Sequence, residues 1–368
     1  MKLDCNRAAF SAALNVVASV IPGKTPKPVL ETVLLTWNGE RAELVGTDLE
    51  IFIRHEVVDV QATSRGEVLL PAKRILDVLR ESKDERITLD CQENTLLLSV
   101  GRGRFNVPTM AASDFPPCSE IPNQTFAAVP GNLLRRMIRR TVFATANNES
   151  RFALNGVLFH FGPKDLRAVA TDSHRLSLVT GVYQPTQDLV QTRAIVPVKT
   201  LNLVDRAIDG TETCVEIGCT QNLIVCKTGQ IQVASKLISG VFPRYEDVIP
   251  RSHCASLDIN VGELLSTLRQ STVFTTEESR GVNFDLTRGT WKLFSQAADA
   301  GVSELELPVG YDGDDIYTRL DPRLFIEALK TLSNETCVNV KLTDEDTPAV
   351  VSTDDGWTFL LMPLAREV

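Results

Sequence analysis

The chain repeats one pattern three times, at intervals of roughly 125 residues. An apolar run meets Thr-Asp at residues 44–48 and again at 168–172. About 25 residues after each, an apolar run leads to a proline and a basic residue, at 69–73 and 195–199, and Leu320-Asp321-Pro322-Arg323 is a looser third copy. This period is the length of a domain, since solenoid units span only about 20–50 residues. Three copies of one domain indicate a curved or ring-like assembly, and a ring suggests something threaded through it.

Two further repeats set the predicted domain boundaries. Helices with a shared ending occur at Thr141-Val142-Phe143, followed by Glu149-Ser150-Arg151, and at Thr272-Val273-Phe274, followed by Glu278-Ser279-Arg280. Two proline-bearing segments, 115–122 and 242–250, share an FP…IP outline, and proline stiffens such connections. We therefore predict domains over residues 1–123, 124–250 and 251–368.

Each predicted domain has the same order of elements. The helices that open the domains are expected at Asn6–Val20, Asn132–Thr145 and Val261–Thr272, and those after the proline–basic signal at Ala72–Arg80, Val198–Ile208 and Pro322–Leu332. Alternating strands are expected at Val29–Leu35, Thr95–Val100, Leu154–Phe159, Asn222–Cys226 and Val282–Leu286. Two helices and many short strands per unit predict an α+β fold, with the helices packed on antiparallel sheets.

Composition predicts a globular protein, and its scattered cysteines and N-terminal sequence lead us to expect it in the cytoplasm. Of its 368 residues 43% are hydrophobic and 23% charged, and no stretch approaches the ~18 apolar residues of a membrane span. The start of the chain shows no secretory signal. Among eight cysteines, Cys214, Cys219 and Cys226 lie closest together, but they lack a CxxC pair and a nearby histidine. We interpret them as small core residues rather than a zinc site, and expect no metal and no cofactor.

The sharpest single element is the helix beginning near Asn132. At 100° per residue its leucines, Met137 and Ile138 form one face, and four arginines fall on the opposite face. The arginines, which have no acid between them, are Arg135, Arg136, Arg139 and Arg140. Guanidinium suits phosphate because it stays charged and donates hydrogen bonds in a fork. The alternative interpretation is an ordinary solvated helix face.

Cations at corresponding places favour the phosphate interpretation. They are Lys24, Lys73, Arg74 and Arg80 in the first domain, Lys199 and Arg206 in the second, and Arg269, Arg323 and Lys330 in the third. The net charge of −9 argues against nucleic acid only if positive charge is spread evenly. Backbone phosphates carry no base information, so such contacts permit sliding on DNA of any sequence.

Enzymatic interpretations find little support. The four histidines, His55, His160, His174 and His253, are far apart in the sequence, and no nucleophile–base order stands out. Gly101-Arg102-Gly103-Arg104 is neither a P-loop nor a dinucleotide turn. Asp48 with Glu50, or Asp172 with His174, has the makings of a catalytic pair. Because Thr-Asp recurs at equivalent places, we instead predict a structural turn whose aspartate accepts backbone N–H groups.

Four motifs in order resemble the bacterial DNA polymerase III beta subunit family, the sliding clamps. They are Gly46-Thr47-Asp48-Leu49-Glu50, Ala170-Thr171-Asp172-Ser173-His174-Arg175-Leu176, Phe242-Pro243-Arg244-Tyr245 and Leu361-Met362-Pro363-Leu364. The resemblance covers the whole chain. It implies a non-enzymatic protein that forms a head-to-tail homodimer of three-domain protomers, a closed ring lined by helices around double-stranded DNA. It also implies a clamp loader that opens the ring, and the polymerase III alpha subunit and repair proteins as partners.

In this family, partner peptides dock in a cleft between the second and third domains. The matching positions are Leu154, Thr171, His174, Arg175, Leu176, Pro243, Val248, Leu360, Met362, Pro363 and Leu364. Aliphatic side chains and two prolines suit a peptide site, and Arg175 would supply a polar anchor. Without the resemblance, ordinary inter-domain core residues would be the simpler interpretation. Ser173 replaces a common glycine, Asp247 a frequently basic residue, and Ala365 begins a variant tail, so the charge preference of the peptide stays open.

The resemblance also names the surfaces that close the ring. Phe105 and Val107 on a domain-one edge strand, and Val273 and Phe274 of domain three, match the apolar interface positions. Arg102 and Arg104 would face Glu304 and Glu306. A head-to-tail contact is heterologous, so it forms a ring only if its rotation closes. Two rival functions are a repeat scaffold that binds proteins without encircling DNA, and a hydrolase or metal-dependent enzyme.

Overall fold

The computed structural model describes residues 2–92, 95–117, 127–147, 152–185, 192–208, 210, 213–276, 279–297 and 301–365. Internal contacts divide the chain into two compact units. Unit 1 consists of Met1–Arg135, Tyr183–Val190 and Lys199–Leu237, and unit 2 of Arg136–Val182, Gln191–Val198 and Ile238–Val368. Residues 149–151 and 278 of the repeated helix endings lie outside the described residues.

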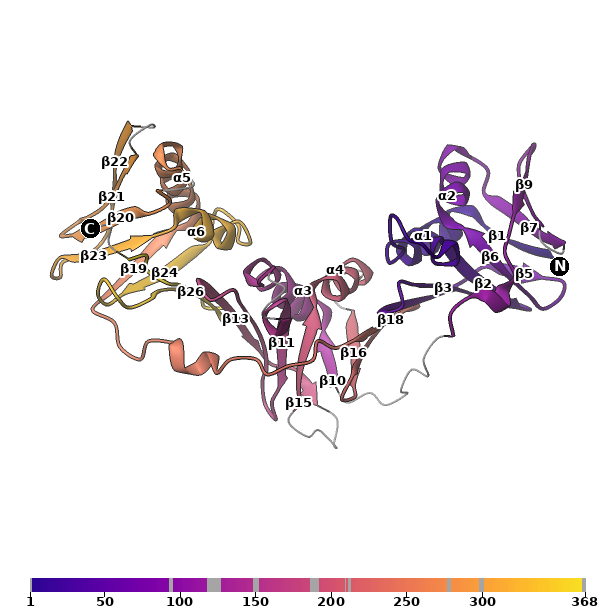
Figure 1. Cartoon of the computed structure of the whole chain (residues 1–368), viewed down its shortest axis with the longest axis horizontal. Helices are drawn as coiled ribbons and strands as arrows, with labels where there is room; N and C mark the ends of the chain where they lie inside the picture. Colours follow the sequence, from indigo (N-terminus) through magenta and orange to yellow (C-terminus); the bar gives the residue numbers. More distant parts are fainter. Residues whose placement is uncertain are drawn as a thin grey trace. The chain divides into compact units, whose positions relative to one another are not determined.

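All six predicted helices form in the described part of the chain (Figure 1). They are α1 (Arg7–Ala18), α2 (Ala72–Glu81), α3 (Gly131–Arg139), α4 (Val198–Ala207), α5 (Val261–Ser271) and α6 (Pro322–Leu329). Side chains cap three of the helix starts: Asn6 accepts the N–H of Ala9 at 3.0 Å, Asn260 that of Gly262 at 2.9 Å, and Asp321 that of Arg323 at 2.9 Å.

The strands pair throughout in antiparallel fashion, which confirms the α+β plan. In unit 1 they are β1 (Lys2–Asn6), β2 (Thr32–Asn38), β3 (Arg41–Thr47), β4 (Ile51–Val57), β5 (Val60–Ala62), β6 (Gly66–Pro71), β7 (Arg86–Gln92), β8 (Thr95–Val100), β9 (Gly103–Pro108), β10 (Ala127–Pro130), β14 (Gln184–Pro185), β16 (Cys214–Cys219), β17 (Leu223–Thr228) and β18 (Ile231–Lys236). In unit 2 they are β11 (Gly156–Phe161), β12 (Leu166–Thr171), β13 (Arg175–Gly181), β15 (Thr192–Pro197), β19 (Ala255–Asn260), β20 (Val282–Thr287), β21 (Thr290–Ala297), β22 (Gly301–Pro308), β23 (Ile316–Leu320), β24 (Cys337–Leu342), β25 (Ala349–Ser352) and β26 (Trp357–Leu361).

Unit 1 contains two sheets among its described strands. One runs β5-β1-β7-β8-β9, and the other β14-β10-β16-β17-β18-β4-β3-β2-β6. In the larger sheet β18 pairs with β4, with Val233 opposite Ile53. This pairing joins strands of the first and second repeats in one continuous sheet.

Unit 2 repeats this construction. Its described strands form the sheets β15-β11-β12-β13-β26-β25-β24-β19 and β22-β21-β20-β23. Here β13 pairs with β26, with Ser177 opposite Phe359, so strands of the second and third repeats also share one sheet. β9 and β22 each lie at the edge of their sheet.

The helices cover the sheets through apolar faces and pack in pairs, α1 beside α2 and α5 beside α6 (Figure 1). In α1 the buried residues Phe10, Leu14 and Val17 face the sheet. Gly46 of β3 permits this close approach, because a Cβ there would lie 2.8 Å from a methyl of Val17 and 2.9 Å from its carbonyl oxygen.

Several predicted element bounds were wrong. The predicted strand Val29–Leu35 begins instead as a 3-10 turn, Pro28–Glu31, and β2 starts at Thr32. Pro28 fixes its own φ and offers no N–H to a neighbouring strand, and the Thr32 hydroxyl closes the turn on the Val29 carbonyl at 2.6 Å. Leu154 likewise ends a 3-10 turn, Phe152–Leu154, ahead of β11.

The helix expected to extend to Thr145 ends at Arg139 and continues only as a 3-10 turn, Val142–Ala144. Thr141 bonds back to the Met137 carbonyl at 2.6 Å, an arrangement that competes with helical bonding. The cysteine prediction holds only for Cys226, which is buried and whose pKa burial raises to about 12. Cys214 is exposed and Cys219 half-buried.

Candidate functional site

The two Thr-Asp motifs form the same structural turn, as predicted. In each, the aspartate Oδ1 accepts backbone N–H groups two and three residues later, at 2.8–3.0 Å. The threonine hydroxyl donates to the carbonyl four residues on, at 2.8 Å for Thr47 and 2.6 Å for Thr171. The remaining oxygen of Asp48 meets the Lys199 ammonium, and that of Asp172 accepts from Arg175 Nε at 3.0 Å. Both carboxylates are therefore committed to holding the fold.

In unit 2 the second turn forms one wall of a cleft of about 620 Å³. Most of its floor is apolar and buried: Leu154, Leu176, Tyr245 and Leu360 are each at most 5% exposed. They belong to a core cluster that also includes Phe242. A floor of fixed aliphatic and aromatic side chains is typical of a site that accepts apolar groups of a ligand.

The rim of the cleft carries large apolar side chains in water. Val241 is 91%, Val248 45% and Met362 36% exposed. Gly240, which precedes Val241, has φ of +142°, and a Cβ there would lie 3.1 Å from that of Ala153. Only glycine fits this loop without strain. Apolar side chains held in water beside an apolar floor indicate an interaction surface.

Arg175 lines the cleft, but its hydrogen-bond donors point at acceptors of its own chain. Besides Asp172, it binds Glu327 of α6 through Nη1 at 2.5 Å and the Phe143 carbonyl through Nη2 at 2.7 Å. Its guanidinium lies over the Phe143 ring, 5.3 Å from the centroid, and its side chain is 9% exposed. Two carboxylates thus neutralise the charge of Arg175 within the chain.

The structure brings most of the predicted cleft residues together. Those that line the cavity are Leu154, Thr171, Arg175, Leu176, Pro243, Val248, Leu360 and Met362. His174, Pro363 and Leu364 do not line it. The His174 carbonyl accepts the Met362 N–H at 2.9 Å, and the Leu364 N–H is bound to the Arg319 carbonyl at 2.7 Å. These contacts hold the C-terminal segment along the turn.

The sequence interpretation missed seven lining residues. They are Ala153, Ser173, Ser239, Gly240, Val241, Arg244 and Tyr245. Ala153, Ser173 and Arg244 adjoin a predicted residue, and five of the seven belong to the single segment 239–248. No clear signal in the sequence marks them, because a single apolar residue in a loop, such as Val241, is common on protein surfaces.

The predicted freely exposed face of four arginines was wrong for three of them. Arg135 lies 3.4 Å from Asp205 and also binds the Ile208 carbonyl, while Arg140 lies 2.7 Å and Arg136 3.8 Å from Asp355. Arg140 is 14% exposed and lies over the Trp357 ring at 5.9 Å. These carboxylates are distant in sequence, so the helix pattern alone did not reveal them. Arg139 is exposed.

Most of the other predicted cations do reach solvent. Exposed members are Lys24, Lys73, Arg74, Arg80, Lys199, Arg206, Arg269 and Lys330. Lys199 differs from the rest, because its ammonium meets Asp48 and donates to the Val20 carbonyl at 3.1 Å. It thereby ties the start of α4 to the first Thr-Asp turn within unit 1.

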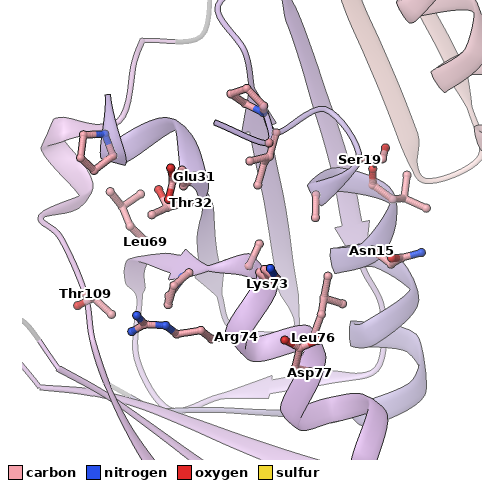
Figure 2. Close-up of a pocket in the computed structure, with 18 of the residues that line it drawn as sticks. Asn15, Ser19, Glu31, Thr32, Leu69, Lys73, Arg74, Leu76, Asp77 and Thr109 are labelled. Atoms are coloured by element: carbon pink, nitrogen blue, oxygen red, sulfur yellow. Dashed lines mark hydrogen bonds between the residues drawn. The ribbon is translucent and has the colours of Figure 1, made fainter. Parts of the chain in front are cut away.

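Part of this basic set surrounds a hollow of about 1040 Å³ beside α1 and α2 (Figure 2). Lys73, Arg74 and Arg80 of α2 and Arg206 of α4 line it, together with the carboxylates Glu31 and Asp77. Arg80 pairs with Asp77 at 3.3 Å, while Lys73 and Arg74 form no ion pair with any described residue. The hollow therefore offers cations to an external anion.

Of the predicted interface residues, Phe105 and Val107 lie on the edge strand β9, and Val273 and Phe274 lie in the 3-10 turn Thr272–Phe274, which contacts the edge strand β22. On β9 Phe105 is 39% exposed, whereas Val107 is buried in its own unit at 7%. On unit 2 Val273 is 69% exposed and Phe274 half-buried, and Phe274 lies 3.5 Å from where a Cβ on Gly301 of β22 would be. Each edge thus presents an unpaired strand beside an apolar surface.

Two features are absent from the part of the chain that the structure describes. Among the described residues, no group of three His, Cys, Asp or Glu side chains is placed to hold a metal ion. No described helix is long and apolar enough to cross a membrane.

The fold is that of a three-repeat clamp protein, and family comparison agrees. Three models match the chain in order: the DNA polymerase III beta subunit N-terminal domain over residues 1–119, its central domain over 128–244 and its C-terminal domain over 246–365. The chain therefore belongs to the DNA polymerase III beta subunit family, the beta sliding clamps.

Individual relatives match over the full length. The beta sliding clamp of Pseudomonas aeruginosa is 32% identical, and the match covers 99% of this chain and 100% of the relative. A crystal structure of the P. aeruginosa beta subunit superposes with a TM-score of 0.94 at 30% identity, with 100% of both chains covered. A P. aeruginosa clamp structure with bound griselimycin gives 0.93 at 31% identity, again over 100% of both chains.

Proposed function

We propose that this chain is a DNA sliding clamp, a processivity factor that catalyses no reaction. Two copies close head to tail into a ring around double-stranded DNA of any sequence. The ring tethers the polymerase III alpha subunit and other replication and repair proteins, and a clamp loader opens it. The cytoplasm is its site of action. Membership of the beta subunit family over the whole chain supports this function.

The observation that supports the ring is that equivalent strands pair in the same way at two places in the chain. β4 pairs with β18, and β13, the equivalent of β4, pairs with β26, the equivalent of β18. The third members of these two sets are β22 and β9, and both are sheet edges. A third junction of the same kind therefore needs a second copy of the chain, with its β9 on β22. A head-to-tail contact of this kind forms a ring when its rotation closes.

The repeats also predict the register of that third junction. Positions in the three repeats can be matched by following the strand pairings from the start of each helix. Ser303 is then equivalent to Ile53 and Ser177, and Phe105 is equivalent to Val233 and Phe359. Since Ile53 faces Val233 and Ser177 faces Phe359, Ser303 should face Phe105 of the second copy. One step along the antiparallel strands, Glu304 then faces Arg104.

This register suits the side chains on both faces. Phe105 points to the core side of its sheet, opposite buried Leu98, and is exposed only because β9 has no outer neighbour. If β9 pairs with β22 of a second copy, Val273 and Phe274 of that copy would cover Phe105. Glu304 and Arg104, both exposed, would meet on the outer face with opposite charge.

A disulfide pair tests both the junction and its register. Directly opposite residues on antiparallel strands have Cα atoms about 4.5–5.5 Å apart, within reach of a disulfide. We expect Arg104→Cys with Glu304→Cys to give a covalent dimer on oxidation, visible on a denaturing gel. The matched control, Arg104→Cys with Glu306→Cys, is offset by two residues and should cross-link far less. Equal yields from the two variants would refute the register, and no dimer from either would refute the junction.

The exposed cations are proposed as the DNA contacts. Lys24, Lys73, Arg74, Arg80, Arg139, Arg206, Arg269 and Lys330 have the exposure that a mobile backbone contact needs. Arg80, Arg135, Arg136, Arg140 and Lys199 carry intrachain partners, so their contribution to DNA binding requires sharing those charges.

The cleft of unit 2 is proposed as the docking site for partner peptides. Its buried apolar floor and exposed apolar rim suit a short segment with aliphatic or aromatic side chains. The three domains are proposed at 1–123, 124–250 and 251–368, and the spans of the three family models support the division into three and the first of the two boundaries. The third family model begins at residue 246, so it includes residues 246–250, which we assign to the second domain.

A further inference from the structure

The charged groups around the cleft differ in what they can offer a ligand. The inference drawn from this difference rests on the proposed docking function. Arg175 is 9% exposed and already binds Asp172, Glu327 and a backbone carbonyl. A ligand carboxylate could use it only by displacing these partners in a desolvated place, where a broken pair is costly. Arg175 therefore forms part of the cleft wall and is poorly suited to recognise the charge of a ligand.

Arg244 is the opposite case. It lines the same cleft, between Pro243 and Tyr245, and its side chain is 87% exposed. Its ion-pair partner in the described chain is Asp247, three residues on, at 3.6 Å, and that carboxylate is 67% exposed. Exposed pairs of this kind are worth little, so a ligand carboxylate can replace Asp247 at small cost.

The other charges near this rim are already paired or acidic. Glu246 lies 3.8 Å from Arg193, and Glu327 is held by Arg175. Asp247 adds a further carboxylate beside Val248. Arg244 is thus the cationic group of the cleft lining that can turn to a ligand, and it projects from the segment that carries the apolar rim.

We propose that Arg244 is a specificity-determining residue of the cleft. It selects peptides that carry a carboxylate next to the apolar side chains that fill the floor. The apolar groups supply the larger part of the affinity, and Arg244 discriminates among peptides that share them. Asp247 competes for the same guanidinium and so weakens the preference.

Binding of labelled peptides to the full-length protein tests this inference. The probes share two leucines and one phenylalanine, and carry Asp, Asn or Lys in turn at each remaining position. At low ionic strength the wild type should favour Asp over Asn at one position by about two- to fivefold, the range of an exposed ion pair. Arg244→Ala should remove this preference and Arg244→Glu should shift it to Lys. Asp247→Ala should enlarge the preference for Asp.

Two controls separate the possible failures. Arg288→Ala removes another exposed, aspartate-paired arginine outside the cleft and should leave the Asp preference intact. Leu176→Asp should abolish binding of every probe if the peptide occupies the cleft. If probes bind, Leu176→Asp blocks them and no position favours Asp, the role of Arg244 is overturned while the docking cleft stands. If no probe binds the wild type, the docking function fails and Arg244 with it.

Discussion

One carboxylate, that of Asp355, is the ion-pair partner of two arginines of unit 2. It accepts from Arg140 at 2.7 Å and from the Thr353 hydroxyl at 2.5 Å, with Arg136 at 3.8 Å. Burial by itself raises the pKa of Asp355, but the hydrogen bonds from Arg140 and Thr353 and the two arginine charges outweigh it. The net pKa lies below the usual aspartate value.

The sign of this shift predicts a pH dependence. A depressed pKa contributes stability that is complete above the unfolded value, near 3.9, and is lost as pH falls through the folded value. Asp355→Asn should therefore lower the free energy of unfolding at pH 7, by up to about 1 kcal/mol because the group is partly exposed. The deficit should shrink between about pH 5 and 3. Urea unfolding across this range measures it, with Asp354→Asn as the neighbouring control; a deficit that stays constant with pH would contradict the assignment.

Ser173 is the second residue whose conformation has a consequence. Its φ is +82°, in the left-handed region, and Leu49 at the equivalent place in the first turn has φ of +79°. A non-glycine residue there carries a strain of about 1 kcal/mol or more. The glycine common to the family at this position would relieve it.

We expect Ser173→Gly to raise the midpoint of thermal unfolding. Relief of strain should exceed the entropic cost of the more flexible unfolded chain, for a net gain of roughly 0.5 kcal/mol. Ser173→Ala keeps the strained backbone and serves as the comparison, so it should not stabilise. A lower midpoint for the glycine variant would show that the turn is not strained.

At the scale of elements, Arg175 connects three of them. Through it the Thr-Asp turn is joined to Glu327 of α6 and to the carbonyl of Phe143 in the 3-10 turn after α3. Because all three partners depend on one planar guanidinium, a single substitution should loosen the whole wall of the cleft.

Arg175→Met should cost about 2–3 kcal/mol of unfolding free energy, since it removes a hydrogen-bond partner of the half-buried Asp172 carboxylate and of the Phe143 carbonyl. Arg175→Lys should recover little, because an ammonium cannot serve three acceptors in the fork geometry. Chemical denaturation followed by tryptophan fluorescence measures both. Arg74→Met, on the exposed face of α2, should change stability by less than about 0.5 kcal/mol. Equal effects at positions 74 and 175 would refute the role of the network.

How far sequence predicted these elements depends on the range of the forces involved. Apolar periodicity located the six helices, since the period reflects burial of one face, and the Thr-Asp repeat predicted a turn that local hydrogen bonds do form. The strand was predicted to begin at Val29 rather than at Thr32, because Pro28 alters only the single turn Pro28–Glu31. Arg135 pairs with Asp205 and Arg140 with Asp355, and only the tertiary fold brings these partners near. Helix patterns carry no record of such partners.

At the scale of the whole molecule, the exposed cations should act together as a non-specific phosphate surface. Replacing Lys73, Arg74, Arg206 and Arg269 by alanine should weaken DNA binding equally for all sequences. The slope of log affinity against log salt should fall by about one for each phosphate that the variant no longer neutralises. Neutralising Arg41, Arg65, Lys227 and Arg288, which are also exposed, changes the net charge equally and should leave the slope unchanged. An equal weakening in both variants would show that only net charge matters.

Topological retention on circular DNA tests the ring itself most directly. The Arg104→Cys, Glu304→Cys protein would be mixed with closed circular DNA, oxidised so that both junctions lock, and washed at high salt to remove electrostatic binding. A ring formed by two chains should stay on the intact circle and leave when the circle is cut once. Dissociation from the intact circle at high salt, or equal retention on circular and linear DNA, would contradict the encirclement of DNA by this protein.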